Sequence, residues 1–261
     1  MIPIRLSPGA WSPVIRRIAT GSSARPAMAI TFDDGPDPES TPHLIDALAE
    51  AGAKATHFLL GERVERHPEL VAALVAAGHD VYAHGWSHEH YAAAQGETAA
   101  AALARSEALL ARHRPTPKTY LIRLPYNAGF TRIAIHRAMR RFHPDVQFAW
   151  WSHAITDYDI AGTRRGEASI RAAIADVVAQ LDARRDLPGG VLLLHDTPVG
   201  PPEDAARMTT RLLVPEVMRV LKAKSFDLVA LKPQLPAAVS RFFFRSPPPV
   251  TVMAAGQAGF L

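Results

Sequence analysis

The sequence predicts a single α/β domain built on a parallel sheet, and three observations support this prediction. The chain has 261 residues, of which 48% are hydrophobic and 21% are charged, as expected for a folded protein with one large core. Short apolar runs alternate with helix-like segments along most of the chain. Clusters of polar residues follow several of the apolar runs. A regular alternation of strands and helices is typical of a parallel sheet.

Each predicted strand is a short apolar run bounded by polar or turn-forming residues. The seven runs cover residues 27–32, 55–60, 80–83, 119–123, 146–151, 190–194 and 226–231. The helix-like segments between them cover residues 42–51, 68–77, 97–113, 131–141, 167–184 and 204–222. Several of these begin with Pro or are followed by Gly, as helices often are.

The positions of the polar clusters favour a barrel over an open sheet, which periodicity alone does not distinguish. The clusters follow the first, third, fourth, fifth and sixth predicted strands, and the C-terminal strand ends of a parallel barrel surround one mouth. We therefore expect one domain over residues 25–233. Residues 1–24 and 234–261 show no clear period, so we expect an irregular N-terminal segment and a tail of unknown role that packs Phe242–Phe244 on the domain.

Composition excludes several classes of function. The net charge is +4, but basic residues are scattered and aromatic residues make up only 7%, so we expect no nucleic-acid partner. There is no cysteine, so a transition metal would need His, Asp or Glu ligands. No apolar run reaches the length of a membrane span, and the first 21 residues lack the apolar stretch of a signal peptide. We expect a cytoplasmic protein without a transmembrane segment.

Two neighbouring acids end the first predicted strand, in the stretch AITFDDGPDP at residues 29–38. Turn chemistry accounts for the Gly and Pro residues, but not for two like charges side by side. The stretch HGWSH places His84 and His88 after the third predicted strand, and chance gives such a pair about as often as a metal site does. Two imidazoles and one carboxylate from Asp33-Asp34 would form a three-ligand site of the kind typical of catalytic zinc. The second carboxylate could then take a proton from water.

The stretch LLLHD places His195 at the end of the sixth predicted strand. A strand-end His can simply bond to a loop. We favour a catalytic role, because amide hydrolysis needs an acid that protonates the departing amine, and His is well suited to that task.

Five stretches in order resemble the motifs of NodB-type polysaccharide deacetylases, carbohydrate esterase family four. They are TFDDGP (31–36), HGWSH (84–88), RLPY (123–126), WSHAITDY (151–158) and LLLH (192–195). The resemblance covers about residues 27–231 and implies the fold of that family, a distorted (β/α)7 barrel. It also implies Asp33 as the general base, His195 as the general acid, and Asp34, His84 and His88 as ligands of one divalent metal ion. Zinc is the expected ion, with cobalt, nickel or manganese as alternatives.

The same resemblance implies roles for five further residues. Arg123 would orient the base, and Asp157 would orient the general acid. The backbone N–H of Tyr126 would stabilise the oxyanion together with the metal. Leu193 would line the pocket for the acetyl methyl group, and Trp151 would contact the substrate.

The chain departs from the family pattern in the second, third and fourth motifs. Gly85 stands where Ser or Thr is usual, which we expect to loosen the loop that presents the histidines. Asn127 replaces a usual Gly beside the oxyanion donor. Ser152 and Ala154 occupy positions where acids are frequent, and Tyr158 replaces a Trp that helps wall the pocket. We expect these changes to affect the substrate more than the reaction.

The remaining histidines are not assigned to the site. We expect ordinary polar roles for His57, His79, His136 and His143, whereas His90 and His153 lie within motif regions and could touch substrate, but neither is predicted to act.

The predicted function is metal-dependent removal of N-acetyl groups from an amino-sugar polysaccharide, oligosaccharide or glycan precursor. One alternative is an amidase or deformylase that acts on a different C–N amide, because related barrels share a metal site while their loops differ. Another is a catalytically silent carbohydrate-binding protein. The combination of Asp33, Arg123 and His195 argues against the silent protein, since binding alone needs no base, orienting residue and acid together. The sequence does not predict the oligomeric state.

Overall fold

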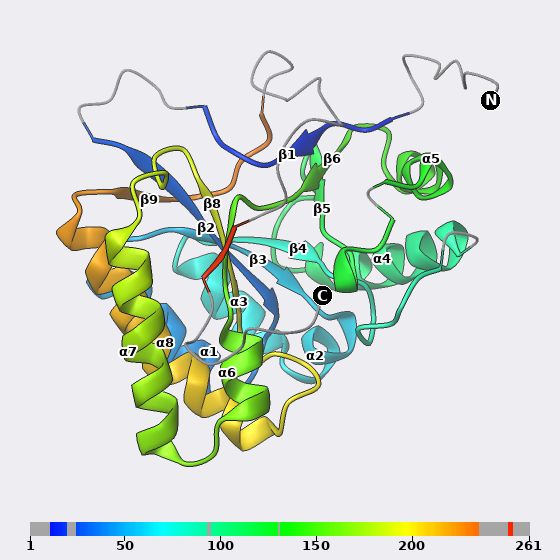
Figure 1. Cartoon of the computed structure of the whole chain (residues 1–261). Coiled ribbons are helices and arrows are strands. Elements are labelled where there is room, and N and C mark those ends of the chain that lie inside the picture. The colour runs from blue at the N-terminus through cyan, green and yellow to red at the C-terminus, as the bar shows by residue number, and fades with distance from the viewer. Residues whose placement is uncertain (1–10, 20–24, 93–94, 130, 235–249, 253–261) are drawn as a thin grey trace, which may run out of the picture.

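The computed structural model describes residues 11–19, 25–92, 95–129, 131–234 and 250–252. Parallel strands form the centre of the molecule and helices cover them on the outside, which confirms the predicted α/β class (Figure 1). The strands are β1 (Val14–Ile15), β2 (Ala27–Asp34), β3 (Ala55–Leu59), β4 (Asp80–Ala83), β5 (Tyr120–Ile122), β6 (Val146–Ala149), β7 (His153–Ile155), β8 (Val191–His195), β9 (Asp227–Ala230) and β10 (Val250–Val252).

These strands pair into two sheets. One has the order β1-β6-β5, and the other has the order β10-β7-β8-β2-β3-β4, with β9 also paired to β2. Among the described residues the two sheets do not join through hydrogen bonds into a closed barrel. The barrel is therefore distorted by two interruptions, one between β4 and β5 and one between β6 and β7.

Side chains cover the interruption between β4 and β5. The Tyr120 hydroxyl accepts a hydrogen bond from the Ala83 N–H at 3.1 Å, and Arg114 donates to the Val81 carbonyl at 2.9 and 3.0 Å. Glu107 on the neighbouring helix accepts hydrogen bonds from Tyr120 and Arg114. The backbone groups of β4 that lack a strand partner are thus satisfied by a buried polar cluster.

The segment that contains β1 covers the region beside the second interruption. Val14 and Ile15 pair with β6, and Arg17 forms an antiparallel bridge with Gly190, just before β8. The Ile18 N–H also donates to the Gly189 carbonyl at 2.9 Å. This short segment therefore connects the two sheets.

The helices pack around the strands. The α-helices are α1 (Thr41–Glu50), α2 (Gly61–Arg66), α3 (Pro68–Ala76), α4 (Gly96–Leu110), α5 (Ile133–Phe142), α6 (Asp157–Thr163), α7 (Glu167–Ala183) and α8 (Glu203–Ala223), with a 3-10 turn η1 (Pro125–Asn127). Figure 1 shows α7 and α8 on one side of the sheets and α4 and α5 on another. No helix in the described part of the chain has both the length and the apolar character needed to cross a bilayer.

The alternation of side chains along β2 separates the core from the site. Met28, Ile30 and Phe32 are buried in an apolar cluster that includes residues of α1, α7 and α8. Thr31 and Asp33 lie on the opposite face of the strand, because successive side chains point to opposite faces. The same strand therefore contributes to the outer core and to the interior of the barrel.

Several predicted elements are corrected by the structure. The predicted strand at 146–151 ends at Ala149, and a separate strand, β7, follows it. Strands β1 and β10 lie in segments that we expected to be irregular, and helices α2 and α6 are not predicted. These elements have two to seven residues, too few to produce a clear hydrophobic period. Residues 242–244 lie outside the described residues.

The last predicted strand corresponds to β9, which pairs with the N-terminal half of β2. Strand β9 pairs only with residues 27–30 of β2, whereas β3 pairs with residues 30–34 of the same strand. It therefore supports the N-terminal end of β2 and does not reach the end where the polar clusters gather.

Candidate active site

The predicted site residues lie at the C-terminal ends of the strands, around a cavity of about 310 Å³. Asp33 and Asp34 end β2, His84 follows β4, and His195 ends β8. Nine of the ten predicted site residues line the cavity: Asp33, Asp34, His84, His88, Arg123, Tyr126, Trp151, Leu193 and His195. The tenth, Asp157, contacts His195. Parallel strands thus bring together residues that are spread from position 33 to position 195.

Asp34, His84 and His88 form a cluster that could hold a metal ion, with one donor atom of each within 4.8 Å of the others. Asp34 Oδ1 lies 3.5 Å from His84 Nε2 and 3.3 Å from His88 Nε2. This carboxylate oxygen is buried and has no hydrogen-bond partner in the described structure. His84 Nδ1 donates to the Arg123 carbonyl at 2.9 Å, which leaves the Nε2 lone pair facing Asp34. A second hydrogen bond of this kind commonly orients a metal-binding His.

The charges in the cluster also suit a metal. Burial raises the pKa of Asp34, but the nearby imidazoles of His195, His84 and His88 and the Val199 N–H lower it, and the net pKa lies below the ordinary value. Burial lowers the pKa of His88 despite the opposing charge of Asp34. An ionised carboxylate and a neutral imidazole are the protonation states that metal ligation requires. The residues therefore fit a divalent cation.

Asp33 is held by a buried arginine. Arg123 Nη1 donates to Asp33 Oδ1 at 2.8 Å and to Thr31 Oγ1 at 2.9 Å, while its Nε donates to the Ala149 carbonyl at 2.9 Å. The guanidinium also lies over the Phe58 ring, 4.4 Å from its centroid. Because Arg123 is fixed from several sides, it holds one oxygen of Asp33. The other, Oδ2, lies 3.9 Å from His84 Nε2, beside the candidate metal site.

His195 is held by Asp157, at the start of α6. Asp157 Oδ1 lies 2.8 Å from His195 Nδ1, and Asp157 Oδ2 accepts the His195 N–H at 2.6 Å. Burial lowers the pKa of His195, but Asp157, together with the charges of Asp34 and Asp33, raises it to about 10. The imidazole is therefore protonated at neutral pH. Its Nδ1 is engaged by Asp157, which leaves Nε2 as the nitrogen available to the cavity.

Aromatic and aliphatic side chains form the rest of the cavity wall. Tyr126 and Asn127 both have positive φ, at 54° and 55°, a conformation that Asn tolerates better than most residues. The side chains of Tyr126 and Tyr158 are 53% and 48% exposed at the mouth of the cavity. Trp151 and Leu193 line the same space. Tyr158, which we predicted to replace a Trp in the pocket wall, lines the cavity.

The loop that carries His84 and His88 is held in place by its neighbours. Gly85 has a φ of +87°, where residues with a side chain are strained. Its carbonyl accepts hydrogen bonds from the Ser106 hydroxyl on α4 at 2.6 Å and from the Gly61 N–H on α2 at 3.2 Å. The Trp86 carbonyl accepts another from the Glu62 N–H at 3.1 Å. We expected Gly85 to loosen this loop, and in the structure three hydrogen bonds oppose that effect.

The two unassigned histidines of the motif regions have different positions. His90 stacks on Tyr126, with ring centroids 3.4 Å apart, so it supports the cavity wall. His153 is fully buried, bonds to Ser152 and lies 3.4 Å from Asp186, away from the cavity. The histidines expected to be ordinary polar residues do not line the cavity: His57, His79, His136 and His143.

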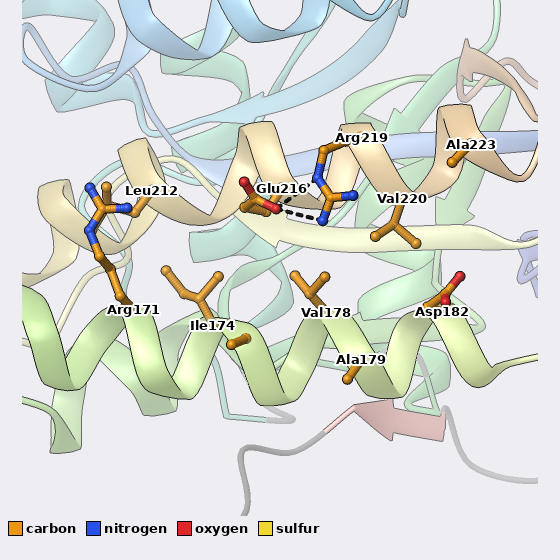
Figure 2. A pocket seen from close by; sticks show the side chains of 11 residues that line it. Arg171, Ile174, Val178, Ala179, Asp182, Leu212, Glu216, Arg219, Val220 and Ala223 are labelled. Atoms are coloured by element: carbon orange, nitrogen blue, oxygen red, sulfur yellow. Dashed lines mark hydrogen bonds and ion pairs between the residues drawn. The ribbon is translucent and has the colours of Figure 1, made fainter.

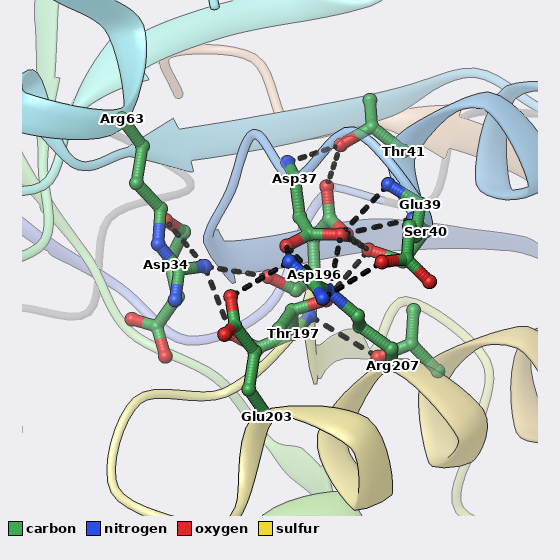
Figure 3. Close-up of polar contacts among 11 residues, drawn as sticks. Asp34, Asp37, Glu39, Ser40, Thr41, Arg63, Asp196, Thr197, Glu203 and Arg207 are labelled. Carbon is green, nitrogen blue, oxygen red and sulfur yellow. Dashed lines mark hydrogen bonds and ion pairs between the residues drawn. The ribbon is translucent and has the colours of Figure 1, made fainter. Parts of the chain in front are cut away.

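Three residues around Asp34 are not predicted from the sequence. The Val199 N–H donates to Asp34 Oδ2 at 2.9 Å. Arg63 donates to the Asp34 carbonyl (Figure 3). Asp196 donates its N–H to the Asp33 carbonyl. Asp196 directly follows His195, and this position is a weak indication in the sequence that Asp196 lies near the site. The sequence gives no such indication for Arg63 or Val199.

A larger cavity lies on the outer surface between α7 and α8 (Figure 2). It has a volume of about 480 Å³ and its walls include Ile174, Val178 and Val220. Glu216 and Arg219 form an ion pair at its edge. None of the predicted site residues lines it. The predicted site residues therefore belong to the cavity at the strand ends and not to this one.

Comparison with known proteins identifies similar sequences. A sequence profile described as polysaccharide deacetylase matches residues 20–140. A peptidoglycan-N-acetylglucosamine deacetylase of Bacillus cereus is 29% identical over 198 residues, which are 74% of this chain and 66% of that protein. A chitooligosaccharide deacetylase of Rhizobium leguminosarum bv. trifolii is 31% identical over 169 residues, which are 64% of this chain and 70% of that protein.

Solved structures are similar over most of the chain. A polysaccharide deacetylase from Bacillus cereus superposes with a TM-score of 0.59 and 26% identity, over 80% of this chain and 93% of that chain. A peptidoglycan N-acetylglucosamine deacetylase in complex with a benzamide derivative superposes with a TM-score of 0.60 and 25% identity, over 85% of this chain and 91% of that chain.

Proposed function

The chain belongs to the polysaccharide deacetylase family, and from that premise we propose that it removes N-acetyl groups from an amino sugar within a glycan. One observation carries the proposal. The candidate metal ligands line the same cavity as a carboxylate held by an arginine and an imidazole held by a second carboxylate. Hydrolysis of an amide needs a base for water and an acid for the leaving amine, and this arrangement supplies both.

Asp33 is the proposed general base. Arg123 binds its Oδ1 and leaves Oδ2 beside Asp34 and His84, where it can take a proton from the attacking water. The ion pair with Arg123 keeps the carboxylate oriented during the transfer. Asp33 itself need not bind the metal.

His195 is the proposed general acid. Its pKa of about 10 keeps the imidazole protonated at neutral pH, so it can protonate the amine as the C–N bond breaks. Asp157 orients the ring and stabilises its charge, as carboxylates paired with a catalytic His do in other hydrolases. The proposed base and the proposed acid are therefore each oriented by a different residue, Arg123 for Asp33 and Asp157 for His195.

Asp34, His84 and His88 are the proposed ligands of one zinc ion. Two imidazoles and a carboxylate with positions left open are typical of catalytic zinc, and cobalt, nickel or manganese could occupy the same donor set. Such an ion, when bound, polarises the amide carbonyl and lowers the pKa of water. The buried, unpaired Asp34 Oδ1 supports this assignment.

The cavity wall is proposed to position the acetyl group. The Tyr126 N–H would donate to the developing oxyanion, and Leu193 would contact the acetyl methyl group. Trp151 and the exposed rings of Tyr126 and Tyr158 would contact the sugar. The curated relatives are named for peptidoglycan and for chitooligosaccharides, which motivates N-acetylglucosamine polymers as the first substrates to test.

Acetate release tests the proposal. The zinc-reconstituted protein is incubated with chitooligosaccharides, with peptidoglycan fragments, and with small amides and formamides. We expect acetate from at least one of the glycans. Release from small amides alone would replace the proposal with an amidase, and glycan binding without hydrolysis would indicate a silent carbohydrate-binding protein.

A further inference from the structure

The backbone of the proposed metal ligand Asp34 has an unusual conformation. Its φ is +79°, a region that residues with a side chain seldom occupy. Such a conformation costs free energy and persists only where surrounding contacts hold it. The contacts around Asp34 therefore determine where its carboxylate points.

The side chain of Arg63 bridges the backbone of Asp34 and the segment after His195. Arg63, on α2, directs Nη1 at three backbone carbonyls, at 2.9 Å from Thr197, 3.3 Å from Asp196 and 3.4 Å from Asp34 (Figure 3). Within the described residues the hydrogen bonds of Arg63 go to backbone carbonyls, and its charge also opposes the rise in the pKa of the buried Asp196 carboxyl. A surface salt bridge does not explain its position.

Two further hydrogen bonds join the same pair of segments. The Asp196 N–H donates to the Asp33 carbonyl at 2.9 Å, and the Val199 N–H donates to Asp34 Oδ2 at 2.9 Å. The segment that begins at His195 thus contacts both acids of the first motif. A shift of this segment would move the general acid and the metal ligand relative to each other.

A buried polar network anchors this segment (Figure 3). The fully buried carboxylate of Asp196 accepts hydrogen bonds from Ser40 Oγ and Thr41 Oγ1, each at 2.5 Å. Ser40 Oγ also lies 2.6 Å from Thr197 Oγ1. These contacts tie the segment to the start of α1, so the Asp196-Thr197 end of the bridge formed by Arg63 is fixed.

We propose that Arg63 is a positioning residue, which holds the Asp34 backbone and the Asp196-Thr197 backbone in one arrangement and so sets the geometry between the metal site and His195. It does not touch the substrate. The part of this inference that concerns turnover rests on the proposed deacetylase function, whereas the part that concerns metal binding does not.

Two substitutions of Arg63 test the proposal, with a matched control on the same helix. Arg63→Met removes all three hydrogen bonds and retains a long, unbranched side chain. Arg63→Lys retains the positive charge, but its single ammonium group cannot donate to the three carbonyls with the geometry of a guanidinium. Arg66→Met is the control, because the Arg66 side chain is 60% exposed and its partner in the described part of the chain is Glu62 on the same helix. Zinc affinity is measured by competition with a chromophoric chelator, kcat and KM by acetate release, and stability by thermal unfolding.

We expect Arg63→Met to weaken zinc binding and to lower kcat, each by about 10–100-fold, with KM unchanged, as for other residues that orient metal ligands. Arg63→Lys should recover part of both losses, and Arg66→Met should match the wild type. If Arg63→Met does not fold, Arg63→Lys carries the same comparison.

Wild-type zinc affinity and kcat in the folded Arg63 variants would overturn the proposal. Equal losses in Arg66→Met would also overturn it, because they would show a general effect on α2. Absence of acetate release by the wild type on every glycan would contradict the proposed function, while the zinc titration would still decide the role of Arg63.

Discussion

At the scale of single residues, the neighbours Asp33 and Asp34 have the same side chain and different environments. Asp33 continues the alternation of β2 and meets Arg123 inside the barrel. Asp34 leaves that alternation through its positive φ and faces His84 and His88. The difference between the two carboxylates comes from the backbone and not from their chemistry.

Asparagine substitutions should therefore separate their roles. Asp33→Asn should retain the metal and lose about 10²–10⁴-fold in rate, the usual contribution of a positioned general base. Asp34→Asn should lose metal affinity, because a neutral amide oxygen is a poorer ligand than a carboxylate. Metal content and acetate release are measured on both variants. Loss of metal in Asp33→Asn with retention in Asp34→Asn would show that the roles are reversed.

The pH dependence of the rate tests the general acid. His195 must be protonated to act, and its pKa is raised to about 10, so activity should persist through neutral pH and fall as pH rises through about 10. Asp157→Asn removes the nearest negative charge, and the basic limb of the kcat profile should move toward neutral pH by about 1–3 units. The profile is recorded at saturating substrate. An unchanged basic limb in Asp157→Asn would assign that limb to another group.

At the scale of an element, the loop at residues 84–88 depends on Gly85 for its shape. A Cβ at this position would lie 3.1 Å from the Tyr91 hydroxyl oxygen, and the φ of +87° would be retained only with strain. Restoring the hydroxyl residue that is usual in the family should therefore not improve this loop. The hydroxyl of Ser106 already binds the loop from α4.

Gly85→Ser should lower the free energy of unfolding by about 1–2 kcal/mol, the usual cost of a left-handed conformation for a residue with a side chain. It should also weaken zinc binding, because the loop carries two of the three proposed ligands. Urea unfolding and chelator competition measure the two effects. As a comparison, Ser106→Ala should cost about 0.5–1.5 kcal/mol through loss of one hydrogen bond. A Gly85→Ser protein as stable as the wild type would show that the loop can adopt another conformation.

At the scale of the whole molecule, buried histidines in the core link stability to pH. His57 on β3 is fully buried, stacks on Phe32, and has no hydrogen-bond partner at either ring nitrogen in the described structure. Burial, and then the neighbouring His79, lower its pKa well below the ordinary value. The pKa of His79 is lowered to about 4, mainly by burial. Both imidazoles are therefore neutral in the folded protein.

As pH decreases below about 6.5, the unfolded chain binds protons at these two histidines while the folded chain does not. The free energy of unfolding should therefore be highest above that pH and fall as pH decreases. Each unit of pKa difference is worth about 1.4 kcal/mol. His57→Leu should flatten this dependence, as measured by urea unfolding at pH 7.5 and pH 5. Burial raises the pKa of Asp196 to about 6, so this carboxyl makes the folded protein more stable as pH decreases, which opposes the effect of the histidines. Asp196 is present in both the wild type and His57→Leu, so the difference between their pH dependences reports on His57. An equal pH dependence in the two proteins would contradict this role for His57.

The resemblance to the deacetylase family supplied five of the candidate site residues: Arg123, Tyr126, Trp151, Asp157 and Leu193. The sequence patterns by themselves predicted the parallel α/β class, the positions along the chain of seven of the ten described strands, and the polar residues at strand ends, namely Asp33, Asp34, His84, His88 and His195. These features are local: an apolar run and the polar residues that follow it are adjacent in the chain. Because parallel strands end at the same side of a sheet, adjacency along the chain was enough to predict that Asp34, His84 and His195 share one cavity.

Only the tertiary structure decided how the barrel is interrupted and how the site is held. Strands β1, β7 and β10 are two or three residues long and form through pairing with distant strands, so their sequences carry no period. The positive φ of Asp34 and of Gly85 is set by neighbours such as Arg63 and Ser106, which are 29 and 21 positions away. Contacts of this kind depend on packing between separate elements, and a local pattern of residues does not predict them.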